Sequence, residues 1–535
     1  MPLGRRNFLQ SLAARLAPAA GRPNLLLILA DDMGFSDLGC YGGEIRTPNL
    51  DKLAARGVRF TSMQNCARCC PSRASLMTGQ YPHRAGVGLM DGDRKLPGYR
   101  GHLQPDCATI PEVLKPAGYT TLMTGKWHLS KPGPTERGFD EYYGLFHGFD
   151  SHWDESKYTR LPAGRAKRSY GPGKFYSADA ITDHALDFLA GARGQAKPWF
   201  LYLAYNSPHF PLHAPKELID SYMETYRQGW DEIRAARYER QKRMGIVDRR
   251  WALSPRGYVP ATRFTTMNGW AGKPIPAWKE LDADRREDLA RRMAIFAAMV
   301  ERMDTNIGRV FEDLDKSGEA DNTLVLFLSD NGACAEWDPR GFDGRSGPEN
   351  VLHRGADLEK MGQPGSYHSY GTGWANACNT PLSLYKHYGH EGGTSTPFIA
   401  SWPQGVKRRG IDRRPAHIFD ILPTLADAGG ASYPKERGGE AIAPAEGISL
   451  LPAFRGEKTP ARTFFLEHEE NRAVRQGKWK AVTVGSGEWA LYDEEADRTE
   501  TRDLAAREPA RVKAMAAQWE EWAQRVHVFP RPGAR

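Results

Sequence analysis

Two apolar runs that each end in acidic or amide residues constrain the fold of this chain more than any other feature. The runs and the residues that follow them are Asn24–Ala30 with Asp31 and Asp32, and Thr323–Ser329 with Asp330 and Asn331. Unbroken apolar runs of this length are typical of strands buried on both faces, as in a parallel sheet covered by helices. Ligands of such sheets bind beyond the carboxyl ends of the strands. The sequence therefore predicts an α/β domain with these polar residues at one rim of its sheet.

Helical patterns separate the predicted strands. Apolar residues between positions 293 and 314 recur every three or four positions, which predicts one buried helical face leading into the second run. Thr47 and Pro48 are typical of a helix start, and Gly57 is typical of its end. A further buried strand is expected at Trp199–Ala204. Alternating strands and helices indicate an α/β domain.

Two long regions lie outside this alternation. Residues 217–292 carry many charges, tryptophans and tyrosines, and we expect peripheral helices there. Between Gly332 and Thr380 the chain is rich in glycine, proline and aromatic residues and has little periodicity. A loop of that length in a compact domain is typical of a lid or a wall of a binding site.

The pattern of predicted secondary structure changes at about Arg462. Short strand candidates at Thr463–Leu466, Trp479–Val484 and Trp489–Tyr492 precede a final helix, which predicts a small antiparallel α+β subdomain. The expected fold class is thus α/β, with a large, mostly parallel mixed sheet flanked by helices and this C-terminal subdomain. We divide the chain into an export-type leader over 1–22, a main domain over 23–460 and the C-terminal subdomain over 461–535.

Composition excludes several classes of protein. Of the 535 residues, 40% are hydrophobic and 26% are charged, which is typical of a soluble globular chain. No apolar run approaches the roughly 20 residues of a membrane-spanning helix, so we expect no membrane span. The 73 Lys and Arg residues exceed the 65 Asp and Glu residues by 8. This mild excess predicts a solubilising surface, with attraction of an acidic substrate or polymer as the alternative. We expect no nucleic-acid partner.

The amino terminus is similar to a twin-arginine export signal. Gly4–Gln10 contains the adjacent arginines, and small residues suited to cleavage follow near Ala20. The intervening apolar stretch is short and is interrupted by Arg15 and Pro18. We therefore expect a periplasmic or secreted protein, with a cytoplasmic one as the alternative.

Four oxygen-bearing side chains are expected at one rim of the sheet. They are Asp31, Asp32, Asp330 and Asn331. Three carboxylates and an amide suit a hard cation, calcium first and magnesium second. The alternative is that each pair only caps the turn after its strand, but two such pairs at strand ends favour a metal site.

The chain has seven cysteines, and the odd number argues against a full disulfide framework. Cys66, Cys69 and Cys70 are clustered, and Pro71 is typical of the first turn of a helix. Cys69 is thus expected at a helix N-terminus, where backbone N–H groups and the helix dipole attract an anion. These residues alone favour a nucleophilic Cys69 with a low pKa. The alternatives are a buried core thiol, or a metal or redox pair with Cys66, which leaves Pro71 to Arg73 unexplained.

The segment Cys69-Cys70-Pro71-Ser72-Arg73, followed by Thr78-Gly79, resembles the signature of type I sulfatases, a branch of the alkaline-phosphatase superfamily. Other segments of that family recur in the same order. They are Ala30–Gly34, Gly125–Leu129, Ser207–Pro211, Ser329–Gly332, and Lys386 with Glu391–Gly393. The resemblance extends from about Asn24 to Leu504 and implies an alkaline-phosphatase-like fold.

The resemblance implies a catalytic role for Cys69. In sulfatases a separate maturation enzyme oxidises the first cysteine of the signature to formylglycine, and one hydroxyl of the aldehyde hydrate attacks sulfur. The alcohol leaves, and the second hydroxyl then expels sulfate and restores the aldehyde, so one hard displacement is split into two steps. The resemblance also implies that Asp330 helps to deprotonate the nucleophile. The implied metal ligands are Asp31, Asp32, Asp330, Asn331 and the modified Cys69.

Positive charge is implied around the sulfuryl group, because its oxygens are negative. The implied residues are Arg73, Lys126, His128 and Lys386. Lys126 and His128 flank Trp127, and alternation along an extended segment is expected to point both the same way. His209 is implied as the general acid that protonates the leaving oxygen, aided by Lys386, because an imidazole titrates near working pH.

The sequence departs from the family pattern at three positions. Cys70 stands where Ser, Thr, Ala or Gly is commoner, and its thiol is able to compete for oxidation or disulfide formation. Thr394 and Ser395 follow Gly393 where an arginine is frequent, which leaves the support of the metal site open. Ser130 stands in place of a glycine after Leu129.

These observations predict a calcium-dependent sulfatase that hydrolyses sulfate monoesters, most simply an arylsulfatase acting on a small sulfated substrate. A carbohydrate sulfatase is the first alternative, because the aromatic segment Ser366–Trp374 suits an aryl ring or a sugar. A phosphonate monoester or phosphodiester hydrolase on the same scaffold is the second. The third is an inactive sulfate-ester-binding protein in which Cys69 remains a thiol.

Overall fold

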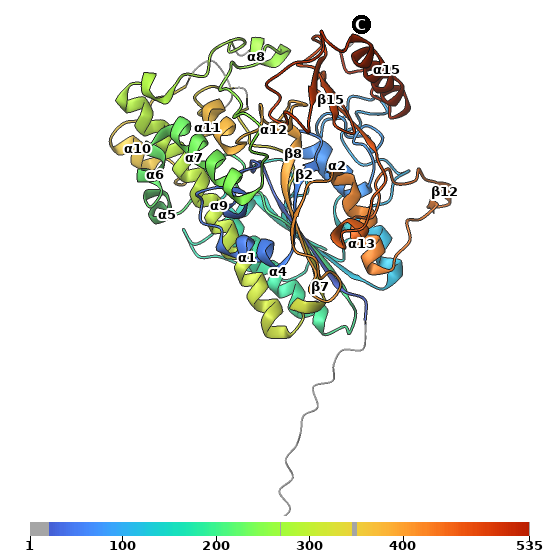
Figure 1. The fold of residues 1–535 in the computed structure, drawn as a ribbon. Helices are drawn as coiled ribbons and strands as arrows, with labels where there is room; N and C mark the ends of the chain where they lie inside the picture. The colour runs from blue at the N-terminus through green and yellow to red at the C-terminus, as the bar shows by residue number, and fades with distance from the viewer. Residues whose placement is uncertain (1–20, 268, 337, 345–349, 534–535) are drawn as a thin grey trace, which may run out of the picture.

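A computed structural model describes residues 21–267, 269–336, 338–344 and 350–533. A ten-stranded mixed sheet lies at the centre, with helices on both faces, and a four-stranded sheet lies at one end (Figure 1). This arrangement confirms the expected fold class. The leader expected over 1–22 lies, except for its last two residues, outside the described residues.

The middle of the large sheet is parallel, as the apolar runs predicted. Its strands are β1 (Asn24–Ala30), β2 (Val58–Gln64), β3 (Thr120–Gly125), β4 (Glu141–Leu145), β5 (Tyr158–Leu161), β6 (Trp199–Ala204), β7 (Thr323–Ser329), β8 (Ser395–Ser401), β9 (Gly410–Asp412) and β10 (Ala416–His417). Their order is β10-β2-β8-β7-β1-β6-β3-β4-β5, with β9 beside β2. β8 runs antiparallel to both neighbours and β5 antiparallel to β4, which makes the sheet mixed.

Side chains of β1 alternate between two hydrophobic cores, one on each face of the sheet. Leu26 and Ile28 belong to the core beneath α1 (Pro48–Arg56), α4 (Ser177–Arg193) and α9 (Ala283–Ser317). Leu25 and Leu27 belong to the core beneath α2 (Cys69–Thr78), α3 (Ile110–Leu114) and α13 (Ile421–Gly429). Figure 1 shows α1, α4 and α9 on one side and α2 and α13 on the other. Burial on both faces explains why the strand is an unbroken apolar run.

The two helices expected from the sequence pattern are present. α9 is 35 residues long and buries the predicted face, including Met293, Val300 and Leu314. α1 begins at Pro48 and ends before Gly57. Thr47 does not cap it through its side chain. The Thr47 hydroxyl instead accepts a hydrogen bond from the backbone N–H of Gly39 at 2.9 Å.

The peripheral helices expected over 217–292 are also present. They are α5 (Lys216–Asp220), α6 (Met223–Arg227), α7 (Gly229–Met244) and α8 (Arg263–Met267). The expectation of an unstructured loop between Gly332 and Thr380 is only partly right. This stretch contains α10 (Ala356–Lys360) and α11 (Gly371–Cys378), and all eight residues of α11 are buried.

The C-terminal part is the antiparallel α+β subdomain that the sequence predicted. It consists of β13 (Thr463–His468), β14 (Asn471–Gln476), β15 (Trp479–Val482), β16 (Ala490–Asp493) and α15 (Pro509–Arg525). α15 packs Met515, Trp519 and Trp522 against the sheet. The sequence did not reveal β14, because its apolar residues are only two, Ala473 and Val474, between charged neighbours.

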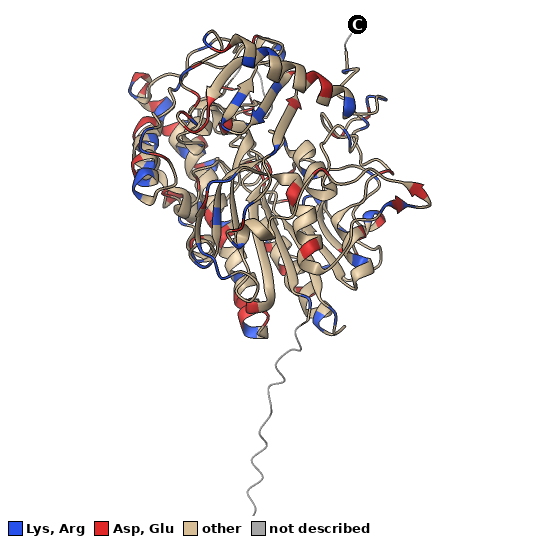
Figure 2. Cartoon of the chain, turned by 45° about the vertical axis from the view of Figure 1, so that its right-hand side comes forward, with Lys and Arg blue, Asp and Glu red and all other residues tan. Residues whose placement is uncertain are grey.

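Figure 2 shows basic and acidic residues interspersed over the outer helices and loops, with few on the central strands. This distribution agrees with a solubilising surface. Among the described residues, no helix is both long enough and apolar enough to span a membrane.

Candidate active site

The carboxyl ends of β1 and β7 place the predicted acidic residues side by side. The two strands pair in parallel with Ala30 opposite Ser329, so the residues that follow each strand meet at one rim. The Asn331 amide donates to Asp32 Oδ1 at 2.7 Å, and the Asp32 backbone N–H donates to Asp330 Oδ1 at 3.3 Å. Asp31, Asp32, Asp330 and Asn331 are all buried. The rim is therefore a compact set of oxygen atoms shielded from solvent.

Two oxygens of this rim fit the requirement of a hard cation. Asp31 Oδ1 and Asn331 Oδ1 are buried and have no hydrogen-bond partner among the residues that the structure describes. A buried polar atom without a partner is costly unless a ligand, an ion or water satisfies it. Burial, and then repulsion from Asp31, raise the pKa of Asp330 well above its usual value. A cation between these groups would offset that repulsion, so the donor set fits calcium or magnesium.

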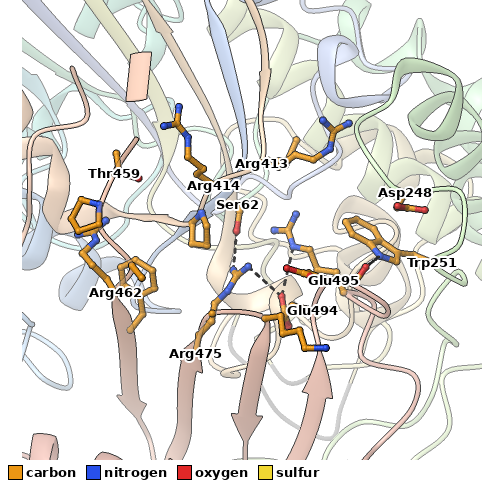
Figure 3. A pocket seen from close by; sticks show the side chains of 18 of the residues that line it. Ser62, Asp248, Trp251, Arg413, Arg414, Thr459, Arg462, Arg475, Glu494 and Glu495 are labelled. Carbon is orange, nitrogen blue, oxygen red and sulfur yellow. Dashed lines mark hydrogen bonds and ion pairs between the residues drawn. The ribbon is translucent and has the colours of Figure 1, made fainter. Parts of the chain in front are cut away.

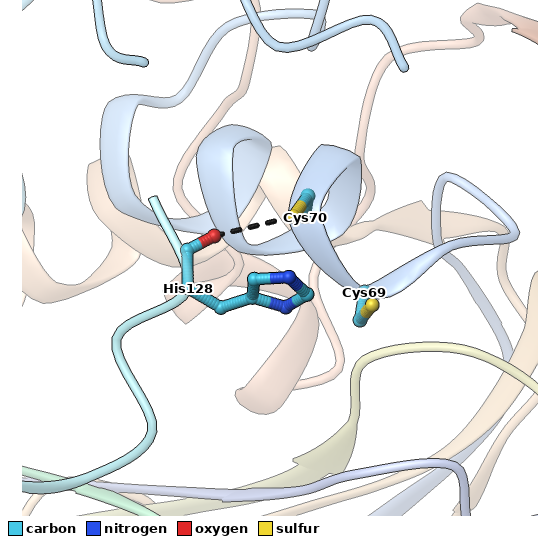
Figure 4. A group of neighbouring side chains, drawn as sticks. All are labelled: Cys69, Cys70 and His128. Atoms are coloured by element: carbon cyan, nitrogen blue, oxygen red, sulfur yellow. Dashed lines mark hydrogen bonds between the residues drawn. The ribbon is translucent and has the colours of Figure 1, made fainter. Parts of the chain in front are cut away.

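Cys69 is the first residue of α2 and is 2% exposed. Its sulfur lies within 4.8 Å of a ring nitrogen of His128, and Figure 4 shows the two side chains beside the N-terminal turn of α2. Hydrogen bonding by Cys70 lowers the pKa of Cys69 well below its usual value. Burial opposes this shift, and the charges of Lys126 and His128 add to it. The structure thus places a group at position 69 where negative charge is stabilised.

Three permanent cations contact the acidic rim. Arg73 Nε donates to Asp330 Oδ2 at 3.0 Å, and Lys126 Nζ donates to Asp31 Oδ2 at 2.6 Å. Lys386 Nζ lies 2.8 Å from Asp32 Oδ1. Each cation is buried, and Arg73 also lies 3.5 Å from Asp31, the carboxylate that Lys126 contacts. The site therefore alternates positive and negative groups around the rim.

Lys126 and His128 both reach the site, but an extended segment does not bring them there. β3 ends at Gly125, and His128 has a left-handed backbone with φ 55°. Gly125 itself has φ 106°, and a Cβ there would lie 1.8 Å from the Ala204 carbonyl oxygen, so only glycine fits. The Cys70 thiol donates to the His128 carbonyl at 3.3 Å, the contact drawn in Figure 4. A turn held by Cys70 thus aims the imidazole at Cys69.

His209 lies across the rim from these residues. Its Nε2 is 3.4 Å from Asp32 Oδ2, and its Nδ1 donates to the Phe210 carbonyl at 2.6 Å. Burial lowers the pKa of His209, and the charges of Asp32 and Asp31 oppose this. Because Nδ1 is occupied by the Phe210 carbonyl, Nε2 is the ring nitrogen that faces the rim.

Three residues that sequence reasoning missed surround Lys386. Its Nζ is 3.1 Å from Glu336 Oε1 and 3.6 Å from Cys334 Sγ, and Arg68 contacts the same Glu336 oxygen at 3.2 Å. Although burial opposes it, the charge of Asp32, together with Cys334 and Glu336, raises the pKa of Lys386 well above its usual value. Cys334 and Glu336 follow β7 closely in the sequence, and this position could have predicted that they lie near the rim.

A family comparison identifies this arrangement. The model of the family described as Sulfatase matches residues 23–431. The chain belongs to the sulfatase family. It is a sulfuric ester hydrolase, as the resemblance of its Cys69 segment implied.

Relatives of this sulfatase are similar over most of their length. An uncharacterized sulfatase of Schizosaccharomyces pombe is 34% identical, over 93% of both chains. An arylsulfatase of Klebsiella aerogenes is 34% identical, over 80% of this chain and 91% of that one. A solved structure described as i-CgsB in complex with a neocarrahexaose has a TM-score of 0.66 and 25% identity, over 96% of this chain and 94% of that one.

An aromatic wall stands beside His209 in this sulfatase. Phe149 stacks on the His209 ring with centroids 5.8 Å apart and an interplanar angle of 12°. Phe149 also contacts Phe210 at 5.1 Å and Tyr367 at 6.4 Å, and it is 48% exposed. Trp374 is not part of the wall. It is fully buried against Trp230 and other aromatics, so the aromatic segment Ser366–Trp374 contributes only Tyr367 to this wall.

The departures from the family pattern have structural counterparts. Ser130 has φ 54°, the left-handed conformation that glycine adopts most readily. Near Gly393, where an arginine is frequent in the family, Arg498 of the C-terminal subdomain donates to Glu391 Oε2 and to Ser395 Oγ, each at 2.8 Å. A guanidinium therefore does lie beside this segment, but it comes from a distant part of the chain.

A cavity of about 590 Å³ lies away from this site, between the main sheet and the C-terminal subdomain (Figure 3). Two of its arginines lie close to carboxylates. Arg462 pairs with Asp420 at 2.6 Å, and Arg475 lies 3.6 Å from Glu494. The cavity thus lies at an interface that contains ion pairs. It has neither Cys69 nor the metal-binding oxygens of the rim.

Proposed function

We propose that this sulfatase hydrolyses sulfate monoesters of aryl alcohols, using a formylglycine made from Cys69 and a calcium ion. The observation that carries the proposal is the position of Cys69. It begins α2, is 2% exposed, and lies beside His128 and next to the rim of Asp31, Asp330 and their cations. An aldehyde hydrate at this position supplies one hydroxyl for attack on sulfur and a second for release of sulfate.

The oxygen ligands of the rim suit calcium. Asp31, Asp32, Asp330 and Asn331 would hold it, and Asp31 and Asn331 each have a buried oxygen without a hydrogen-bond partner in the described structure. A bound cation supplies charge that polarises the sulfuryl oxygens. Arg73, Lys126 and Lys386 contact the same carboxylates, and with a cation bound there they would be available to the negative oxygens of the substrate.

Each remaining residue has a defined task in the proposed reaction. Asp330 accepts the proton of the attacking hydroxyl. Lys126 and Arg73 hold the negative sulfuryl oxygens in a site shielded from water, where fixed charge acts most strongly. His209 acts at the leaving oxygen through Nε2, because Nδ1 is committed to the Phe210 carbonyl. Lys386 and His209 both contact Asp32, so Lys386 is placed to assist His209 at the leaving oxygen.

The aromatic wall favours an aryl leaving group. Phe149 is stacked on the ring of the general acid and nearly half exposed, so a second aromatic ring can pack on it without displacing core residues. An arylsulfatase of Klebsiella aerogenes is among the relatives. A carbohydrate sulfatase is the competing function, because i-CgsB was solved with a neocarrahexaose.

Peptide mass spectrometry and kinetics together test this proposal. We expect the peptide containing Cys69 to carry an aldehyde in active enzyme, and Cys69→Ala to abolish turnover while leaving the fold intact. The kcat/KM values for an aryl sulfate, a sugar sulfate and an aryl phosphate should rank in that order. An active enzyme with an unmodified thiol contradicts the mechanism, and a reversed order for the first two esters contradicts the substrate class.

We also propose that the chain is exported, on the basis of Gly4–Gln10 alone. Sequencing the mature amino terminus after cell fractionation tests this. A cytosolic protein that still begins near Met1 contradicts export.

A further inference from the structure

A second group of potential metal ligands lies outside the acidic rim, where the C-terminal subdomain meets the main domain. It consists of His387, next to the active-site Lys386, and of His468 and Glu469 at the turn between β13 and β14. One ligand atom from each lies within 4.8 Å of the other two. His387 and His468 are 1% and 0% exposed. The three side chains therefore meet in the interior, although His387 and His468 lie 81 positions apart in the sequence.

His468 is the unusual member of this group. Neither of its ring nitrogens has a hydrogen-bond partner among the described residues. Burial lowers the pKa of His468 to about 4, so the ring is neutral at neutral pH. A fully buried imidazole that makes no hydrogen bond loses its hydration without compensation, which is unfavourable unless a ligand satisfies it. A neutral imidazole is also the form that binds metal ions.

The turn that presents Glu469 is strained. Glu469 and Glu470 have φ 49° and 69°, two successive left-handed residues in a tight hairpin. Asn-Gly or Asp-Gly is the usual sequence for this geometry, and side chains larger than these are disfavoured in it. Strain of this kind persists where the surroundings impose it, and it concentrates at functional sites. Here it aims the Glu469 carboxylate at His387, with Oε2 2.8 Å from Nδ1.

We propose that His387, His468 and Glu469 form a second metal site, for a borderline cation such as zinc. Two imidazoles and one carboxylate are a typical zinc ligand set, whereas the rim of the active site offers only oxygen. The two imidazole rings have centroids 6.0 Å apart and are tilted by 31°, which suits two ligands of one tetrahedral ion. Glu469 Oε1 is 3.6 Å from His468 Nε2, close to the separation of two ligand atoms that each lie about 2.0–2.1 Å from one tetrahedral zinc ion.

Residues around the group can support this role. His387 would bind through Nδ1, which leaves the proton on Nε2, 3.9 Å from Glu336 Oε1. A carboxylate behind the second nitrogen is the usual support of a histidine ligand. Arg68 now lies 2.5 Å from His387 Nε2 and must turn away when that nitrogen is protonated. It already contacts Glu336 at 3.2 Å, so a partner for its guanidinium is in place.

Zinc bound at this site would affect the active site, because both share neighbouring residues. His387 follows Lys386 directly, and Arg68 immediately precedes Cys69 at the start of α2. Bound zinc would link the β13–β14 turn to His387, and Arg68 would lose its contact with the His387 ring. We therefore expect zinc to lower kcat without competing with the substrate.

Direct binding measurements test the proposal independently of turnover. Zinc is titrated into calcium-saturated enzyme in the presence of a chromogenic chelator, and the same is done with His468→Asn and Glu469→Gln. We expect each variant to bind one zinc fewer, or to bind it at least tenfold more weakly. His353→Asn is the matched control. It removes a histidine from the group Asp343, His353 and His368, whose members already hold Arg292 and Asp288.

Cobalt provides a readout that needs no variant. In wild-type enzyme saturated with calcium, cobalt bound by nitrogen and oxygen ligands in a tetrahedral or five-coordinate site gives intense visible bands, and zinc should displace them. Equal zinc stoichiometry and equal zinc affinity in wild type and His468→Asn overturn the proposal. So does a weak cobalt spectrum of the octahedral type in wild type, which shows adventitious binding only.

Discussion

His209 has a fixed proton arrangement because its Nδ1 donates to the Phe210 carbonyl at 2.6 Å. In the proposed reaction, Nε2 of a protonated His209 is therefore the nitrogen that gives its proton to the leaving oxygen. His209→Asn keeps a polar side chain of similar size but cannot transfer a proton. We expect kcat to fall by about 10²–10⁴-fold with little change in KM.

The loss in His209→Asn should grow with the pKa of the leaving alcohol, because a good leaving group needs no proton. Turnover of a series of substituted phenyl sulfates measures this dependence. An equal loss for every ester would show that the imidazole serves only to position the substrate.

Phe149 permits a second prediction at the scale of one residue, because it is 48% exposed and stacks on His209. Phe149→Ala removes aromatic contact worth about 0.5–1.5 kcal/mol, so KM for an aryl sulfate should rise by roughly 2–12-fold. Stability should change little, since the ring buries only part of its surface. Phe149→Leu, which keeps apolar volume without a stacking face, should recover only part of the loss. An unchanged KM for aryl sulfates would show that the aromatic wall does not contact the substrate.

Some residues of the site were predictable from local sequence and others were not. Asp31 and Asp330 follow apolar runs, and a parallel sheet brings such strand ends to one rim whatever the loops do. Trp374 was misjudged, because aromatic composition does not tell a wall residue from a core residue. Arg498 and Glu469 were missed because only the packing of the C-terminal subdomain brings them near Glu391 and His387.

At the scale of elements, the short helix α12 (Glu391–Thr394) connects the C-terminal subdomain to the catalytic rim. Glu391 is buried and meets Lys480 and Arg498, each at 2.8 Å. Behind it, the Gly332 backbone N–H donates to the Gly393 carbonyl at 3.2 Å, and Lys386 N–H donates to the Ala333 carbonyl at 3.0 Å. The loop that carries Lys386 is thus held against Asn331 by charges from β15 and from the segment after β16.

Lys480→Met tests this connection. It removes the buried ammonium that Glu391 and Glu500 share and leaves Glu391 with Arg498 as its nearest cation, and breaking a buried ion pair costs about 3–5 kcal/mol. We expect the free energy of unfolding in denaturant to fall by that amount. Lys478→Met is the control on the same side of the subdomain, since Lys478 is 42% exposed and pairs with Asp493 at the surface. The connection is wrong if the two variants lose the same stability.

The whole molecule should respond to pH through the same junction. Burial, and then repulsion from Glu391, raises the pKa of Glu494 to about 7. Burial raises the pKa of Glu500 to about 8, although the charge of Lys480 opposes this shift. In the unfolded chain a glutamate titrates near about 4.3. The unfolded state therefore releases these protons first as pH rises, so this contribution to stability is present at low pH and is lost through about pH 7–8.

Glu494→Gln removes one of the two groups. We expect the variant to lose less stability than wild type between about pH 5 and about pH 8, because an amide has no proton to release. Denaturation midpoints at both pH values measure the difference. Parallel pH profiles in the two proteins would show that Glu494 does not titrate in this range.

The complete burial of α2 has a consequence for the proposed formylglycine. Every residue from Cys69 to Thr78 is buried, with the main sheet behind the helix and α13 packed on it. Under the proposed mechanism, an enzyme that oxidises the Cys69 thiol would have to act before these layers close. Synthesis, folding and oxidation would then compete for each new chain, and the active fraction of a preparation would record the outcome.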